Sequence, residues 1–190
     1  RSGEAYFLEL ERLIRSARQE IHLQVYIFSP DSTGRRIAEE LQTAAKRGVR
    51  VYLMVDAYGS SGINGPFEKQ LTDAGVFVQR YGRLYQHGRF HLGRRLHRKL
   101  AVIDGYSALV GGINISDHYR IGNKGDNPWL DFAVLLEGIA ARRLRLICRK
   151  RWLNIRFRKR APHIRTPRLE EYILKGFTTP VRITENDFFH

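Results

Sequence analysis

The segment from Leu96 to Tyr119, LHRKLAVIDGYSALVGGINISDHY, constrains the fold of this chain more than any other stretch. Near its middle, Asp104-Gly105 separates two short apolar runs, LAVI and ALV. An Asp-Gly pair between apolar runs is the strongest short-range signal for a β-hairpin, since both residue types tolerate the positive φ angles of a tight turn. We therefore expect two antiparallel strands, the first of them spanning residues 97–103.

The first strand and the turn carry three polar residues at fixed spacing. His97, Lys99 and Asp104 stand in the pattern H-x-K-x4-D. Side chains alternate between the two faces of a strand, so His97 and Lys99 share one face and Asp104 has the opposite parity. We expect the imidazole and the ammonium to act together. The place of Asp104 at the turn favours capping or ion pairing that holds the hairpin.

The second strand is expected to end at Gly111-Gly112, after which Asn114 and Ser116 follow. Glycines remove side chains at a point where a ligand must approach backbone amides, and Asn and Ser add neutral hydrogen-bond donors. An imidazole, an ammonium and several neutral donors together suit a phosphate group.

The block H-x-K-x4-D with the following G-G-x-N-x-S resembles the signature of the phospholipase D superfamily, and the wider context is similar to bacterial cardiolipin synthases. The resemblance implies a phosphatidyl transferase that converts two phosphatidylglycerol molecules into cardiolipin and glycerol through a phosphohistidine on His97. It implies no metal ion and no organic cofactor, because side chains supply charge neutralisation and proton transfer. The phosphate-binding residues implied are Lys99, Gly111, Gly112, Asn114 and Ser116.

The resemblance also implies a catalytic set that adds two carboxylates, Asp104 and Asp131, to His97 and Lys99. Asp131 interrupts the apolar run WLDFAVLL, residues 129–136, which we expect to form a strand. A carboxylate buried in such a strand needs a cationic or hydrogen-bonding partner. In the superfamily, an acidic residue at the corresponding place hydrogen-bonds the motif His and orients it, so the resemblance gives Asp131 this role.

The remaining chain alternates between helical and extended patterns. Apolar spacing predicts the first helix up to Ala17-Arg18, and Ser32 or Thr33 is expected to cap a second helix that Gly48 ends. This pattern predicts an α/β fold with a mixed, largely parallel β-sheet flanked by helices on both faces, as in a phospholipase D-like half domain. The other expected elements are strands 20–28, 49–56 and 76–79 and helices near 67–74 and 139–152.

Residues 81–96, YGRLYQHGRFHLGRRL, show no regular period and are rich in glycine, arginine and aromatic residues. They directly precede the His97 strand, so this loop either overhangs the site or is a solvated surface loop. His87 and His91 within it are four residues apart, but they lack the carboxylate or thiolate neighbours of a metal site. We therefore expect no metal.

The formal net charge of +14 comes almost wholly from one segment. Residues 142–168 hold twelve Lys and Arg and no Asp or Glu, which leaves the rest of the chain with 21 basic and 19 acidic side chains. Such a block indicates an anionic partner, either a phospholipid membrane surface or nucleic acid. The resemblance favours the lipid and implies a peripheral place on the cytoplasmic side of the bacterial inner membrane.

The sequence predicts two unequal parts. Residues 1–176 are expected to form an N-terminal phospholipase D-like domain with a basic linker from about residue 154. Residues 177–190 resemble the start of a second half, so the expected partner is a second half of the same kind or a second copy of the chain. No apolar run reaches the roughly 18 to 20 residues of a membrane span, and the single cysteine, Cys148, fits a reducing compartment.

Three functions remain open at this point. The first is phosphatidyl transfer, with this chain as one half of the enzyme. The second is a dimeric phospholipase D-type phosphodiesterase that acts on nucleic acid. The third is a catalytically incomplete half domain that binds a membrane surface. The segments GGINISDHY and DFAVLLEG favour the first, because a nuclease needs no such extended similarity to the synthases.

Overall fold

The computed structural model describes residues 3–82, 85–86, 89–90, 95–120, 128–157, 181 and 183. Its helices are α1 (Gly3–Ser16), α2 (Ser32–Lys46), α3 (Gly65–Asp73), the 3-10 helix η1 (Asp117–Tyr119) and α4 (Ile139–Phe157). Its strands are β1 (Glu20–Val25), β2 (Arg50–Asp56), β3 (Phe77–Tyr81), β4 (Tyr85–Gln86), β5 (Arg89–Phe90), β6 (Leu100–Ile103), β7 (Ser107–Gly111) and β8 (Ala133–Glu137).

Six strands form one mixed sheet in the order β3-β2-β1-β6-β7-β8. The strand–helix–strand repeats build its parallel part, because β1 pairs with β2 and β2 with β3 in parallel. The pairs β1–β6, β6–β7 and β7–β8 are antiparallel. The mixed α/β fold is therefore confirmed, but the sheet is not largely parallel: two of its five strand pairs are parallel, and three are antiparallel because a hairpin and β8 extend the sheet beyond β1. Strands β4 and β5 pair separately.

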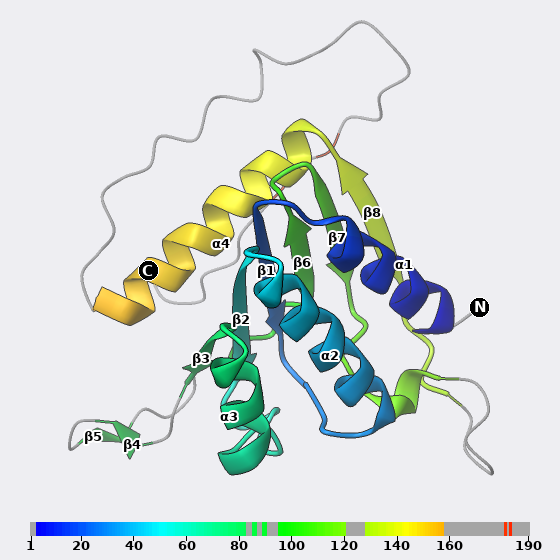
Figure 1. Cartoon of the computed structure of the whole chain (residues 1–190). Coiled ribbons are helices and arrows are strands. Elements are labelled where there is room, and N and C mark those ends of the chain that lie inside the picture. The colour runs from blue at the N-terminus through cyan, green and yellow to red at the C-terminus, as the bar shows by residue number, and fades with distance from the viewer. Residues whose placement is uncertain are drawn as a thin grey trace, which may run out of the picture.

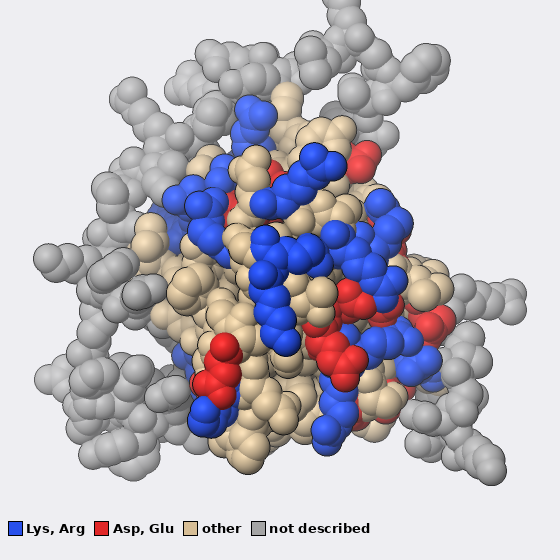
Figure 2. Space-filling view, in the orientation of Figure 1, with Lys and Arg blue, Asp and Glu red and all other residues tan. Residues whose placement is uncertain are grey.

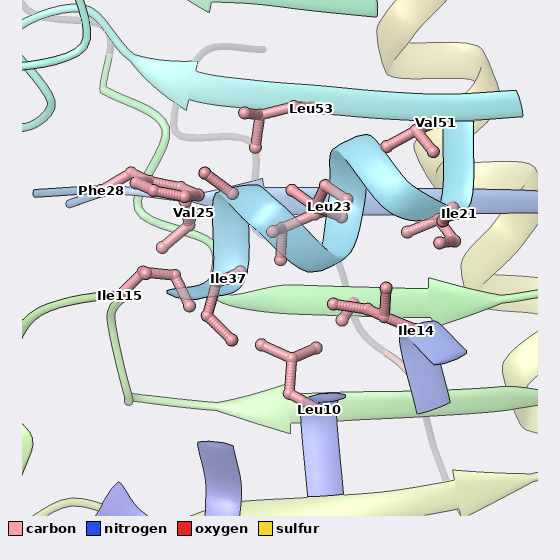
Figure 3. Packing of buried hydrophobic residues seen from close by; sticks show 14 of the residues in the cluster. Leu10, Ile14, Ile21, Leu23, Val25, Phe28, Ile37, Val51, Leu53 and Ile115 are labelled. Atoms are coloured by element: carbon pink, nitrogen blue, oxygen red, sulfur yellow. The ribbon is translucent and has the colours of Figure 1, made fainter. Parts of the chain in front are cut away.

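Helices cover both faces of this sheet, as the sequence predicts (Figure 1). Helices α1, α2 and α3 lie on one face, and their buried side chains form the larger core with the inward residues of β1 and β2. Figure 3 shows Leu10 and Ile14 of α1 close to Ile21 and Leu23 of β1 within this core. On the opposite face, α4 packs Ala141, Leu144 and Cys148 against β6 and β7.

The Asp-Gly hairpin forms at the predicted place. Leu100 pairs with Val110 and Ile103 with Ser107, and the turn between them contains two positive φ angles, 53° at Asp104 and 66° at Gly105. The Asp104 carboxylate accepts hydrogen bonds of 2.8 to 2.9 Å from the backbone amides of residues 18, 19 and 20, directly before β1. Asp104 therefore ties the hairpin to the first strand.

Several predicted boundaries were wrong. The strand expected at 20–28 ends at Val25. The first hairpin strand begins at Leu100, not at residue 97, because β7 ends at Gly111 and the pairing with β1 stops at Leu100, which leaves residues 97 and 98 without a partner strand. Strand β8 begins at Ala133, not at residue 129, since the Trp129 amide donates to the His118 carbonyl. Helix α4 continues to Phe157, so residues 154–157 are not a linker.

A buried polar group lies where α4 crosses β1. The Glu20 carboxylate pairs with Arg145 of α4 and with Arg50, and His22 Nε2 lies 3.6 Å from Glu20 Oε1. The His22 ring stacks on Tyr52 with centroids 4.8 Å apart. Burial lowers the pKa of His22 to about 4, although the charge of Glu20 acts in the opposite direction.

This histidine should make stability depend on pH above the range in which carboxylates titrate. In the unfolded chain it takes up a proton near pH 6.5, whereas the folded state stays neutral down to about pH 4, so stability falls as the pH drops. We expect a loss of about 2 kcal/mol between pH 7 and pH 5 from this group. Urea unfolding at both pH values should show the loss, and His22→Phe, which keeps a ring beside Tyr52, should remove it. An equal loss in His22→Phe would contradict this assignment.

Candidate active site

His97 and Lys99 lie in the extended segment directly before β6. The Gly111 amide donates to the Lys99 carbonyl at 3.1 Å, so the backbone of Lys99 continues the pairing of the hairpin. The two side chains differ in exposure: Lys99 is 8% exposed, and His97 is open to solvent. A histidine at the surface and a buried ammonium two residues away thus share one end of the sheet.

The charge of Lys99 is not neutralised by an ion pair. Among the described residues, no carboxylate forms a salt bridge with Lys99 and no group accepts a hydrogen bond from its Nζ. Burial lowers the pKa of this ammonium below its ordinary value, and the negative charge of Asp131 acts in the opposite direction. A buried cation with unused donors is unfavourable unless a ligand supplies the anion, so this ammonium is suited to bind one.

Tyr26 is the aromatic side chain that joins these two residues, and the sequence analysis did not identify it. It lies just after β1, with its ring centroid 5.4 Å from that of His97 and 5.3 Å from Lys99 Nζ. The contact with Lys99 is a cation–π interaction, which attracts the ammonium without occupying its N–H groups. The signal for it was weak, since Tyr26 is one of several residues in the expected strand 20–28 and no motif marks it.

Asp56 is a second residue that the sequence analysis missed. This carboxylate, at the end of β2, is fully buried. Its Oδ1 accepts the amides of Tyr58 and Gly59 at 3.0 Å, and its Oδ2 accepts the amide of Leu96 at 2.8 Å. Asp56 therefore fixes both the loop after β2 and the residue before His97. The sequence signal for this residue was its position, since Asp56 is a carboxylate at the end of an otherwise apolar strand.

Gly111 and Gly112 have a different use from the one predicted. Their amides donate to the carbonyls of Lys99 and Phe132, so they belong to the sheet and do not form an open nest of donors. A Cβ atom on Gly112 would lie 2.1 Å from both carboxylate oxygens of Asp131. The glycine thus makes room for Asp131, and the close approach that the sequence indicated is to this side chain.

Asn114 and Ser116 are buried and hold loops in the structure. Asn114 Oδ1 accepts the Ile27 amide at 3.0 Å, and its Nδ2 donates to the Tyr119 hydroxyl at 2.9 Å. The Ser116 hydroxyl donates to Asp31 Oδ2 at 3.0 Å, beside the first turn of α2. One N–H of Asn114 is not used by any described residue, so a phosphate contact from this residue stays a prediction. The hydroxyl of Ser116 is committed to Asp31.

The two predicted carboxylates lie apart. Asp131 comes just before β8, where its Oδ1 accepts the Phe132 amide at 2.7 Å and its charge acts on Lys99. No hydrogen bond joins Asp131 to His97 in the part of the chain that the structure describes. Asp104 follows β6, so it lies at the end of that strand opposite to Lys99. The structure brings Asp131 toward the site and leaves Asp104 outside it.

No group of three or more His, Cys, Asp and Glu residues among the described ones could hold a metal ion. None of the described helices has the length and apolarity that crossing a membrane requires.

Comparisons with known proteins agree on one family. The family model described as the PLD-like domain of cardiolipin synthase matches residues 10–124. Cardiolipin synthase B from Escherichia coli K12 is 36% identical over 140 residues, which are 72% of this chain and 33% of that protein. Cardiolipin synthase 1 from Bacillus cereus is 30% identical over 153 residues, 80% of this chain and 30% of the relative.

The chain therefore spans about a third of the length of these relatives. Among solved structures, NucT from Helicobacter pylori has the same fold, with a TM-score of 0.59 and 21% identity over 78% of this chain and 88% of its own. The matched segment contains β1 to β7, Tyr26, His97 and Lys99, that is, most of the candidate site. This chain belongs to the family of PLD-like domains of cardiolipin synthase.

Proposed function

We propose that this chain carries one half of an active site for phosphatidyl transfer between phospholipids. The observation that supports this most strongly is the buried Lys99 ammonium, which has no ion-pair partner among the described residues and lies two residues from an exposed imidazole. The ammonium attracts the phosphodiester, and the imidazole is placed to attack it. The relatives, named cardiolipin synthases, supply the substrate class.

The proposed reaction has two displacements at phosphorus. An unprotonated nitrogen of His97 attacks the phosphorus of phosphatidylglycerol, the bond from phosphorus to the glycerol oxygen breaks, and a phosphohistidine forms. A hydroxyl of a second phosphatidylglycerol then attacks this phosphorus, gives its proton to the base left when the glycerol was protonated, and releases His97, which gives cardiolipin. Lys99 balances the charge that develops on the non-bridging oxygens in both steps. In this proposal, the Asn114 N–H that no described residue uses donates to one of these oxygens.

A second unit is part of the proposal. The departing glycerol oxygen needs a proton, and the imidazole that attacks must be unprotonated, so His97 cannot perform both tasks in one step. His22 is buried under α4 with its pKa lowered to about 4, which leaves it neutral at physiological pH. We infer that the acid comes from a second unit of the same kind, either a further part of the protein or a second copy of the chain.

The half-site can be tested with a substrate whose leaving group needs no acid. The 190-residue chain should react with bis(p-nitrophenyl) phosphate in a burst of about one p-nitrophenolate per chain, because this phenolate departs unprotonated and leaves a phosphohistidine. Phosphatidylglycerol should give no turnover under conditions in which sedimentation shows only monomer. Stopped-flow absorbance measures the burst, and mass spectrometry locates the adduct.

His97→Ala should abolish the burst, and His118→Ala, which removes another exposed histidine, should keep it. A burst of normal size in His97→Ala, or an adduct on a different histidine, would refute the assignment of the nucleophile. Steady turnover of phosphatidylglycerol by the monomer would show that the acid lies within this chain.

The basic residues of α4 provide a surface for an anionic membrane. Arg142, Arg149 and Lys150 are exposed on this helix, which contains no Asp or Glu. In contrast, Figure 2 shows acidic and basic side chains side by side over α1 and α2, where Arg12 and Arg15 pair with Glu9 and Glu40. We propose that α4 and the following basic residues contact anionic lipid. The segment Arg158-Lys159-Arg160, part of this prediction, lies outside the described residues.

Vesicle binding tests whether the basic residues of α4 bind anionic lipid or are ordinary solvent-exposed charges. Replacing Arg142, Arg149 and Lys150 with Gln should weaken binding to phosphatidylglycerol vesicles roughly 100-fold, since each basic residue near the surface contributes about 1 kcal/mol. Binding of the unaltered chain should fall steeply as salt rises from 50 to 300 mM. A triple change elsewhere, Arg18, Lys46 and Lys69 to Gln, is the matched control. Equal losses in both triples, or salt-independent binding, would contradict a lipid surface on α4.

A further inference from the structure

The phosphate site proposed above depends on an ammonium that forms no salt bridge with any carboxylate of the described residues. An ion pair would hold Lys99 firmly, but it would occupy the donors that the phosphate requires and would compete with the substrate for them. The face of an aromatic ring attracts a cation and leaves its N–H groups free. Tyr26 provides such a face, with Lys99 Nζ 5.3 Å from its centroid.

The same ring also limits where His97 can lie. The Tyr26 and His97 rings meet at 52° with their centroids 5.4 Å apart, a tilted aromatic contact. His97 is exposed to solvent and has no hydrogen-bond partner among the described residues, so the contact with the Tyr26 ring is a restraint on the imidazole that does not use its nitrogens. One side chain therefore contacts both the nucleophile and the cation.

The loop after β2 packs against Tyr26 and restrains it. A Cβ atom on Gly59 would lie 2.5 Å from the Tyr26 carbonyl oxygen and 3.0 Å from two atoms of its ring, so only glycine fits this contact. The Ser60 hydroxyl donates to the Tyr26 carbonyl at 2.8 Å and accepts the Phe28 amide at 2.9 Å. The backbone of Tyr26 is thereby fixed on both sides.

Asp56 couples this loop to the segment that carries the histidine. Its carboxylate binds the Gly59 amide, which presses on Tyr26, and the Leu96 amide, which precedes His97. Trp152 of α4 lies in the same buried cluster as Leu96. The loop that contacts Tyr26 and the backbone directly before His97 are therefore both bound to one buried carboxylate.

We propose that Tyr26 is a positioning residue whose ring contacts both the Lys99 ammonium and the His97 imidazole and so keeps the two groups beside one phosphate site. The proposal rests on the proposed function for the identity of the ligand, and it concerns the ring of Tyr26, not its hydroxyl. The Gly59 contact and the Asp56 hydrogen bonds keep that ring in place.

The experiment uses the 190-residue chain with inorganic phosphate as the probe. Calorimetry measures phosphate affinity, and NMR measures the ring-current shift of the Lys99 Cε protons, which needs no ligand. Tyr26→Leu should weaken phosphate binding about 10-fold and abolish the ring-current shift, because the cation–π contact is lost. Tyr26→Phe should bind within about threefold of the original chain and keep the shift. Gly59→Ala keeps the Tyr26 side chain but presses a Cβ atom on its carbonyl and its ring, so it should also weaken binding.

Tyr106→Leu is the matched control and should change neither readout. Tyr106 is an exposed tyrosine in the hairpin turn, at the end of β6 opposite to Lys99. Thermal melts identify any variant that loses its fold. Unchanged affinity and an unchanged shift in Tyr26→Leu would overturn the proposal, and so would a loss in Tyr26→Phe equal to that in Tyr26→Leu. If the original chain binds no phosphate, the proposed function fails, and the ring-current shifts alone still decide whether Tyr26 positions Lys99.

Discussion

The buried charge of Lys99 is the constraint on which the site depends. Burying a lysine until the whole residue is 8% exposed is costly, and ordinary proteins offset that cost with a carboxylate in direct contact. Here the described residues offer an aromatic face and the more distant charge of Asp131. The ammonium is thus left without an ion-pair partner among these residues, and the phosphodiester of a bound substrate would supply the negative charge.

Carboxylates elsewhere in this domain bind backbone amides and fix loops. Asp104 holds the residues before β1, and Asp56 holds the loop after β2 together with Leu96. Asp31 and Asp117 hold each other's segments at the start of α2, where Asp117 accepts the amides of Ser32 and Thr33. These four residues lie in turns or at strand ends, so the loops around the sheet are fixed by charge-assisted hydrogen bonds.

The parts of the site that follow from local pattern could be predicted from the sequence. The hairpin at Asp104-Gly105 formed because turn chemistry is local, and the spacing of His97 and Lys99 placed both beside the same ring. Asp104 has the parity opposite to His97 and Lys99 in the sequence, and in the structure it lies away from them and binds backbone amides before and at the start of β1. Asp131 came toward Lys99, although its predicted hydrogen bond to His97 is not formed.

The parts that depend on tertiary contacts could not be predicted. Tyr26 and Asp56 lie more than forty residues from His97 in the sequence, and only the sheet order β2-β1-β6 brings them to it. Gly111, Gly112 and Ser116 carry hydrogen-bond donors of the kind that binds phosphate. In the structure, these donors are already bonded to neighbouring strands and loops. A sequence motif names the residues, and the surrounding fold decides which of their donors stay free.

The most direct test of this account compares phosphate affinity and stability in one variant, Lys99→Met. If the ammonium is kept for an anion, its removal should abolish measurable phosphate binding without lowering the free energy of unfolding, because the charge forms no salt bridge with the described residues. Calorimetry with inorganic phosphate and urea unfolding at pH 7.5 measure the two effects. Unchanged phosphate affinity, or a marked loss of stability in Lys99→Met, would contradict the account.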